Sequence, residues 1–469
     1  MDGSPNHIAY AMLFAWPLVC IVLFVVLPTE LAAISSLLGG YLLLPSIISV
    51  DLPLVPPLDK TSVAAVSTLI LCWMKGQQKR PPPQSWTIYA LCLAYIVAPI
   101  FTSLGNSYEL QYAGVSIPGF YPLDAVKIAG RNFIFLAPFF IGSRYLSSSQ
   151  SRILLLKAVG VAALIYSLPM LFEVRFSPQL NKWVYGYYPR SFETVMRGGG
   201  FRPNVFIETG IMAATFVALA LIAAIVATRG RWRIWRVPGG AASAYLAALL
   251  VVCKSLGAFV YGAIAAPIVM FTRPRTWTKV ACALLLLACA YPELRWHGLI
   301  PIHHIADAAK SISPARFESF ETRVKNEDQL LSKAEEKPAF GWGAWGRNRI
   351  YSAVTGQDIS LTDGEWVIEF GTWGWLGYLS LFGLFAAAGL RAMRAVGREN
   401  TTDNIAIGGL SILLAVNVMD LLPNATLSPV LFLVAGSLAR AVPVHVRQQL
   451  RQTSKLEHAA EPMLASSSG

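Results

Sequence analysis

The chain has 469 residues, of which 55% are hydrophobic and only 14% charged, and it carries a formal net charge of +12. Because a soluble domain carries about 25% charged residues, this composition excludes an ordinary soluble protein and indicates a polytopic membrane protein. The six cysteines lie in or beside apolar segments, without the spacing of a disulfide framework or a metal site.

Apolar segments recur along nearly the whole chain, and most are long enough to cross a hydrocarbon layer of about 30 Å. They predict an all-α protein of about 12 to 13 transmembrane helices, forming a single membrane domain over residues 1–469. No small-residue cleavage site follows the first segment, so we expect it to remain as an anchor. The predicted spans are 8–28, 31–50, 61–74, 85–103, 123–143, 153–172, 204–227, 239–254, 256–271, 280–293, 372–390, 404–422 and 427–440.

Lysine and arginine are concentrated in short loops that fall on one side of the predicted topology, at 75–80, 229–236 and 273–279. Cytoplasmic loops are enriched in these residues, so we assign that side to the cytoplasm. The tail 441–469 is then cytoplasmic, and we expect it to be disordered. The opposite side receives the segments 104–122, 173–203 and 294–365. The side of the N-terminus depends on whether the number of spans is odd or even.

The segment 294–365 stands out, because loops of about 70 residues are generally either functional or disordered. Apolar residues recur within it at roughly helical spacing before a compact turn at 338–343, so we expect an ordered helical loop. This loop and 173–203 are both rich in lysine and arginine, on the side where topology does not require them. Tolerated surface charge is the simpler explanation, and for the set as a whole we favour binding of an anionic ligand.

Charged residues also occur within the apolar segments. They are Asp124, Lys127 and Arg131, which share one helical face, and the single charges Glu208, Lys254 and Asp420. Intramembrane charges mark functional sites by default, and in the predicted topology all of these fall in the outer halves of their helices. They indicate a polar cavity that opens outward, although snorkelling toward the interface also explains Asp124 and Lys127.

Arg197 and Arg202 flank a run of three glycines just before Pro203 and Asn204. We expect a helix to begin here, because proline suits the first helical turn. Glycines let a backbone approach a ligand closely, and a helix N-terminus offers free amides and the positive end of a dipole. The string 197–204 is therefore a candidate diphosphate site, with a flexible hinge as the simpler alternative.

Three segments together resemble a known family. The first is 197–204, and the second is Arg323 followed by Pro338 and the Gly-Trp-Gly of 341–343. The third is Asp363-Gly364, nine residues and then the Gly-x-x-Gly of 374–377. Their order and spacing are similar to the O-antigen ligase and O-antigen polymerase superfamily, polytopic enzymes that act on polyprenyl-diphosphate-linked glycans. The resemblance covers about residues 190–435 and implies a GT-C-like fold in the bacterial inner membrane, with a periplasmic active site.

The chain departs from the family pattern at two places. Asp363 stands where the ligase signature has a histidine, and Gly364 stands where it has an amide or hydroxyl residue. A second family string, Ser-Arg-Gly-Ala, is replaced by the sequence of 255–258, which lacks the arginine. Lys254 directly before it would supply a cation, as a point charge without the bidentate fork of arginine.

Glycosyl transfer from a lipid diphosphate needs a base for the acceptor hydroxyl, and cations or amide donors for the departing diphosphate. Asp363 is the candidate base, and Glu369, His297, His303 and His304 are the alternatives. We expect neither a metal nor a cofactor, because arginine and lysine supply the positive charge. The candidate diphosphate ligands are Arg197, Arg202, Arg323, Lys254, Arg131 and Arg316.

The resemblance thus implies inverting, metal-independent transfer or polymerisation of undecaprenyl-diphosphate-linked repeat units, as in an O-antigen or exopolysaccharide polymerase. We favour this over a ligase that attaches glycan to lipid A core, because the ligase histidine is missing. The implied partners are the lipid bilayer, the donor, a glycan or lipid-linked acceptor, and chain-length regulator and flippase proteins, and no nucleic acid. A glycolipid transporter or flippase is the rival, although the internal repeats typical of such folds are not visible in the sequence.

Overall fold

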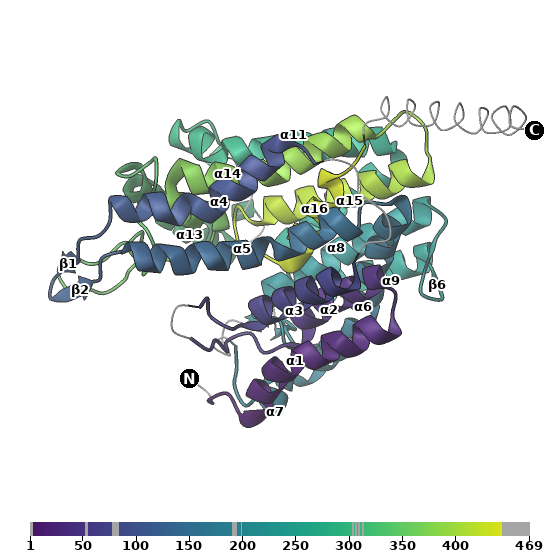
Figure 1. The fold of residues 1–469 in the computed structure, drawn as a ribbon, viewed down its shortest axis with the longest axis horizontal. Helices are drawn as coiled ribbons and strands as arrows, with labels where there is room; N and C mark the ends of the chain where they lie inside the picture. Colours follow the sequence, from purple (N-terminus) through teal and green to yellow (C-terminus); the bar gives the residue numbers. More distant parts are fainter. Residues whose placement is uncertain are drawn as a thin grey trace, which may run out of the picture.

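The computed structural model describes residues 3–51, 55–76, 84–189, 195–197, 199–302, 304, 307, 310–311 and 314–442. This part of the chain is mostly helical (Figure 1). Within it, eight helices are long and apolar enough to cross a membrane, so the prediction of an all-α, multi-pass membrane protein is confirmed at that level. They are α1 (His7–Val26), α4 (Trp86–Leu104), α5 (Pro122–Tyr145), α6 (Ser149–Phe176), α8 (Gly210–Arg229), α11 (Pro274–Trp296), α14 (Glu365–Ala395) and α15 (Thr402–Asp420).

Shorter helices and three small hairpins complete the described chain. The apolar short helices are α2 (Thr29–Leu43), α9 (Gly239–Val252), α10 (Leu256–Phe271) and α16 (Pro429–Ala439), and the others are α3 (Lys60–Lys75), α7 (Leu180–Tyr185) and α13 (Pro314–Glu335). The antiparallel hairpins pair β1 (Leu110–Tyr112) with β2 (Val115–Ile117), β3 (Met196–Arg197) with β4 (Gly200–Phe201), and β5 (Arg233–Ile234) with β6 (Val237–Pro238).

Each predicted span overlaps one helix, but several boundaries differ. The span expected at 372–390 begins earlier, at Glu365, and the span expected at 204–227 begins later, at Gly210. The span expected at 31–50 ends at Leu43. The early start of α14 was missed because its first turns carry the charged residues Glu365 and Glu369, which are buried inside the protein. The other two helices are shorter than their apolar segments, because apolar residues also continue into the adjoining turns. The predicted tail lies, apart from its first two residues, outside the described residues.

The helices α8 and α15 form the centre of the bundle. In their most apolar stretches 94% of the residues of α8 and 83% of those of α15 are buried inside the protein, against 28% for the peripheral α1. The helix α8 owes this position to its alanines, which are buried along most of its length. Small side chains let neighbouring helices approach closely, and dispersion contacts then hold them together.

The connections divide between two ends of the bundle. In Figure 1 the hairpin β1–β2 and the helices α7 and α13 lie toward one end, which we call the loop end, and β6 lies toward the other. The backbone N–H of Asn6, just before α1, donates to the carbonyl of Tyr185 in α7 at 2.9 Å. The start of α1 therefore lies at the same end of the bundle as the large loop.

The helix α14 is broken, and the compact turn of the large loop is inserted at the break. Gly374 has φ 62° and ψ −162°, so the helical hydrogen-bond ladder is interrupted there. We call residues 338–343 the docking turn, since its Trp342 and Gly343 amides donate to the carbonyls of Gly371 and Thr372, both at 2.9 Å. Its carbonyls at 338 and 339 in turn accept from the amides of 375 and 376, at 2.7 and 3.2 Å.

The docking turn thus satisfies backbone groups that the break would otherwise leave unpaired in the interior. Gly374 has to be a glycine: a Cβ at this position would lie 2.5 Å from the carbonyl carbon of Ala339, and its backbone conformation is essentially restricted to glycine. The Gly-x-Gly and Gly-x-x-Gly strings are separate motifs in the sequence, but in the structure they contact each other and form one structural joint, the docking turn hydrogen-bonded to the break of α14.

Several cations of the large loop hold the loop itself in place. Lys337 donates to the carbonyl of Gly105 at 2.9 Å and to the side chain of Asn106 at 2.7 Å. Arg347 is fully buried and donates to the carbonyls of Trp342, Tyr108 and Pro118. For these residues the expectation of a shared role in anion binding is wrong, because they anchor the loop to the segment between α4 and α5. Lys333, which lies over the rings of Tyr112 and Trp342, has the same role.

Candidate functional site

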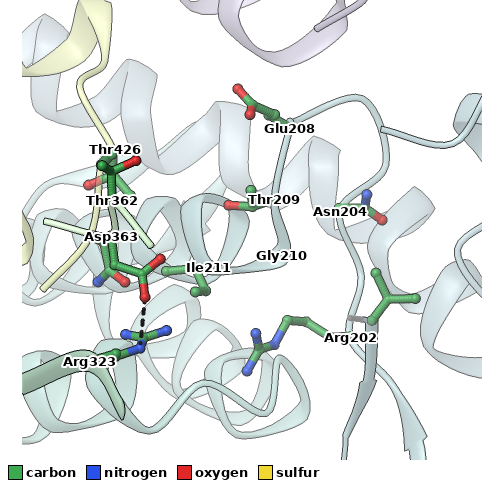
Figure 2. Close-up of a pocket in the computed structure, with 13 residues that line it drawn as sticks. Arg202, Asn204, Glu208, Thr209, Gly210, Ile211, Arg323, Thr362, Asp363 and Thr426 are labelled. Carbon is green, nitrogen blue, oxygen red and sulfur yellow. Dashed lines mark ion pairs between the residues drawn. The ribbon is translucent and has the colours of Figure 1, made fainter. Parts of the chain in front are cut away.

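An open pocket of about 290 Å³ lies where three parts of the chain meet (Figure 2). The first part is the segment that leads into α8, the second is α13 of the large loop, and the third comprises the residues just before α14 and just after α15. The lining residues are Val195, Arg202, Asn204, Glu208, Thr209, Gly210, Ile211, Arg323, Thr362, Asp363, Asn424, Ala425 and Thr426. The pocket therefore brings together three residues that the sequence nominated separately: Arg202, Arg323 and Asp363.

Arg323 and Asp363 form an ion pair across the pocket, with 3.2 Å between Nε and Oδ2. Their side chains are 37% and 47% exposed, so the pair is open to solvent. The strand-like segment before α14 is fixed against α13 by Asn326, whose side chain accepts a hydrogen bond from the Leu361 amide at 3.1 Å. Asn326 lies three residues after Arg323 on α13, and side chains at that spacing lie on one helical face.

Arg202 reaches the pocket across the N-terminus of α8. Its Nη2 atom donates to the carbonyl of Lys254 at 3.0 Å. A Cβ on Gly210 would lie only 2.3 Å from the Cδ of Arg202, so the arginine can cross this helix terminus only because residue 210 is a glycine. The N-cap Thr209 accepts from the Met212 amide at 3.2 Å. The amides of Gly210 and Ile211, two residues that line the pocket, have no acceptor within the helix, as is usual for the first turn.

The pocket thus combines two guanidinium groups with the N-terminal end of a 20-residue helix. Figure 2 shows both guanidinium groups on one side of the pocket, with Arg323 next to Asp363, and Glu208 on the other side. Arginine and the positive end of a helix dipole both favour an anion, and helix termini of this kind bind phosphate groups. This side of the pocket is chemically suited to a phosphate or diphosphate.

The glycine string 197–204 does not begin a helix, so that prediction is wrong. The strands β3 and β4 lie here instead and form a hairpin in which Arg197 pairs with Gly200, and Gly199 has φ 69°. The helix α8 begins only at Gly210. The backbone N–H and C=O groups that a helix would have paired are instead paired between the two strands of the hairpin. The side chain of Arg197 and the placement of Gly198 lie outside the described residues.

A buried carboxylate stands behind the polar wall of the pocket. Asp420 is 1% exposed and accepts from the hydroxyls of Thr215 and Thr426 at 3.0 and 2.9 Å, and from the amide of Asn424 at 2.9 Å. It therefore orients Asn424 and Thr426, which line the pocket and which sequence reasoning missed. Their signal was an Asn-Ala-Thr string directly after Pro423, between two apolar segments.

The other candidate cations do not line this pocket. Lys254 supports Arg202 through its carbonyl, and its Nζ atom lies against Gly200. Arg131 lies on α5, where its charge acts on the buried carboxylates Glu365 and Glu369. Arg316 belongs to the first turn of α13, but its side chain lies outside the described residues.

The alternative bases are also placed elsewhere. Glu369 is 6% exposed in α14 and is not in contact with the pocket. His297 is exposed at the end of α11 and lies 2.9 Å from Glu293, and His304 is exposed as well. His303 lies outside the described residues. Of the described candidate bases, Asp363 is therefore the one that lines the pocket, together with Glu208, which was noted only as an intramembrane charge.

Comparison of the chain with models of known protein families and with curated proteins finds no match. Across the described ranges, no three His, Cys, Asp or Glu residues are grouped so that they could hold a metal ion.

Proposed function

We propose that this protein is a membrane glycosyltransferase that transfers or polymerises undecaprenyl-diphosphate-linked glycan units on the periplasmic face of the bacterial inner membrane. One observation carries the proposal. Arg202, Arg323 and the N-terminus of α8 meet the carboxylate of Asp363 in a single open pocket at the meeting point of membrane helices and large loop. An anion-binding side next to a carboxylate base is the combination that transfer from a lipid diphosphate requires.

The reaction assigns each group a role. Asp363 accepts the proton of an acceptor hydroxyl, and the oxygen of that hydroxyl attacks the anomeric carbon of the donor sugar. The bond from this carbon to the diphosphate oxygen breaks, and its electron pair leaves with the diphosphate. Arg202, Arg323 and the first amides of α8 stabilise the charge that develops on the leaving group. A single displacement of this kind inverts the anomeric configuration.

The size of the pocket bears on the substrate. Ligand pockets generally measure about 300 to 1,000 Å³, and this one lies at the lower limit with about 290 Å³. A pocket of this size suits the reacting end of the donor, with the remaining glycan outside and the polyprenyl chain in the bilayer. Its polar wall of Asn204, Asn424 and Thr426 offers neutral donors and acceptors suited to sugar hydroxyls.

The decisive experiment is reconstitution of the purified protein in liposomes with a lipid-diphosphate oligosaccharide. A ladder of repeat lengths is expected and identifies a polymerase. A single transfer to a lipid A core acceptor identifies a ligase instead, which is the second candidate because the spacing of Asp363 and the Gly-x-x-Gly string matches the ligase signature. If no product forms and the lipid crosses the bilayer, the protein is a transporter and the proposal is wrong.

A further inference from the structure

The turn that carries Arg202 into the pocket has a strained backbone. We call residues 202–206 the pocket turn. Its Val205 is fully buried and has φ 53°, in the left-handed region that β-branched residues rarely adopt. A conformation of this kind is strained and persists only where the surrounding structure imposes it. Something next to the pocket turn must therefore hold it.

The residue that holds it is Glu173, in the last turn of α6. Its side chain is fully buried, and Oε2 accepts hydrogen bonds from the Asn204 amide at 2.9 Å and the Val205 amide at 2.7 Å. Its other oxygen accepts from the Leu180 amide at 3.2 Å. Two successive amides thus converge on one buried oxygen of Glu173, which fixes the backbone of the strained residue from the side of α6.

A second side chain of α6 extends the clamp. The hydroxyl oxygen of Tyr166 accepts from the Phe206 amide at 3.0 Å, and Tyr166 is 3% exposed. Tyr166 and Glu173 are seven residues apart, two helical turns, and so lie on one face of α6. Three successive amides of the pocket turn, at 204, 205 and 206, are thus bound by this one face.

These contacts determine which groups of the pocket turn remain for a ligand. The amides at 204 to 206 point away from the pocket to α6, so they are not available to a phosphate. The side chains of Arg202 and Asn204 are not held by α6 in this way, and both residues line the pocket.

We propose that Glu173 is a positioning residue for anion binding: by accepting the Asn204 and Val205 amides it imposes the left-handed conformation of Val205 and thereby directs Arg202 to the pocket. Glu173 does not touch the ligand. This inference rests on the proposed function insofar as the anion is the donor diphosphate, but its test needs only an anion.

The test measures the binding of inorganic pyrophosphate to the full chain in lipid nanodiscs. In Glu173→Gln the side chain keeps only one acceptor oxygen, so it cannot bind the amides of the pocket turn and of Leu180 together, and we expect pyrophosphate affinity to fall about tenfold, the equivalent of one buried hydrogen bond. The matched control is Asp59→Asn. Asp59 also accepts two backbone amides, at 2.9 and 2.7 Å, but it does not line the pocket, and its variant should bind like wild type.

A second change separates positioning from other roles. Glycine adopts the left-handed conformation at no steric cost, so Val205→Gly added to Glu173→Gln should restore affinity to within about threefold of wild type. A role of Glu173 as a mere charge, or in overall stability, predicts no such rescue. Where Glu173→Gln fails to fold, Tyr166→Phe removes one clamp contact and should weaken pyrophosphate binding by about threefold, again with rescue by Val205→Gly.

The outcomes are distinct for the two proposals. Wild-type affinity in Glu173→Gln, or absence of rescue by Val205→Gly, overturns the positioning role while leaving the proposed function intact. Failure of the wild-type protein to bind pyrophosphate overturns both. Binding with the expected losses and rescue, in a protein that transfers no glycan, supports the positioning role and contradicts the proposed function alone.

Discussion

Two turns of this protein, the docking turn at 338–343 and the pocket turn at 202–206, look alike in sequence and have opposite roles. Each contains a proline and lies in or close to a group of glycines. Each also has positive φ angles, at Gly341 and Gly343 in one and at Val205 in the other. The backbone of the docking turn is bound to the broken helix α14, and its Trp342 side chain is 7% exposed. The backbone of the pocket turn is bound to α6, and its side chains line an open pocket.

The comparison teaches that the role of a turn depends on what its side chains contact after its backbone groups have found hydrogen-bond partners. Both turns have their amides bound to another part of the chain. In the docking turn the side chains are also used by the fold, through contacts such as the hydrogen bond from Trp342 Nε1 to the carbonyl of Lys333 at 2.7 Å. In the pocket turn, Arg202 and Asn204 are presented to whatever enters the pocket. Changes in the first should therefore affect folding, and changes near the second should affect binding and transfer.

The largest expected effect is on the pocket side. Asp363→Asn removes the proposed base, and transfer should fall by about 10²- to 10⁴-fold, the usual contribution of a general base. The same change frees Arg323 from its partner, so pyrophosphate should bind about two- to fivefold more tightly, as expected for loss of an exposed ion pair. Transfer is measured in liposomes and binding in nanodiscs.

The control for Asp363→Asn is Asp358→Asn, which removes a loop carboxylate paired with Arg349 away from the pocket. It should leave both quantities unchanged. Full transfer activity in Asp363→Asn would move the base to Glu208 or to the alternatives Glu369, His297, His303 and His304.

The next largest effect is expected at the structural joint. Gly374→Ala forces a side chain into a left-handed position at φ 62° and places a Cβ 2.5 Å from the backbone of the docking turn. Backbone strain alone should cost about 1–3 kcal/mol of unfolding free energy, and the clash adds to it. Unfolding in increasing fractions of a denaturing detergent measures the loss.

Gly257→Ala in α10 is the matched control for Gly374→Ala. Its backbone is not in the left-handed region, and a Cβ there meets nothing within 4 Å, so stability should be unchanged or slightly increased. If the Gly374→Ala protein is as stable as wild type, the docking turn does not have the structural role that distinguishes it from the pocket turn.

A smaller effect sharpens the assignment of the two pocket arginines. Arg202→Gln and Arg323→Gln should each weaken pyrophosphate binding about tenfold and should reduce its sensitivity to salt, because each removes one charge-assisted contact. Their effects should not be additive, since both side chains act on one ligand. Arg349→Gln, an exposed arginine of the same loop, should bind pyrophosphate like wild type. If all three variants bind pyrophosphate equally well, the anion does not bind at Arg202 and Arg323.

The smallest expected effect concerns the pH dependence of the loop. Burial acts to raise the pKa of Asp358, but hydrogen bonds from Ser360 and Arg349 outweigh it and lower the pKa from its ordinary value. The contact therefore stabilises the folded loop above the ordinary carboxyl pKa and is lost as pH falls through the lowered one. As a partly exposed pair it should contribute less than about 1 kcal/mol.

Thermal unfolding of wild type and Asp358→Asn tests this dependence. The wild type should be slightly more stable near pH 7, and the difference should disappear near pH 3 and below. A difference that is the same at both pH values would show that the carboxylate charge has no part in it.

Much of the fold followed from local sequence. The apolar segments determined the class and the approximate position of each membrane helix, because burial in a bilayer demands about 20 apolar residues whatever the neighbours. Arg202, Arg323 and Asp363 could also be identified as candidate site residues from the sequence, because charged residues stand out next to apolar segments.

Only the tertiary structure decided how those candidates were used. It placed Arg202 over Gly210, paired Arg323 with Asp363 and put Glu369 and Arg131 elsewhere. It also assigned Glu173 and Asp420 to the support of the pocket, and the docking turn to the break of α14. These roles depend on hydrogen bonds between residues far apart in the chain, such as Glu173 with Asn204 and Val205. Composition and helical period report only what a residue does among its sequence neighbours, whereas satisfying buried backbone groups is a condition that the whole fold has to meet.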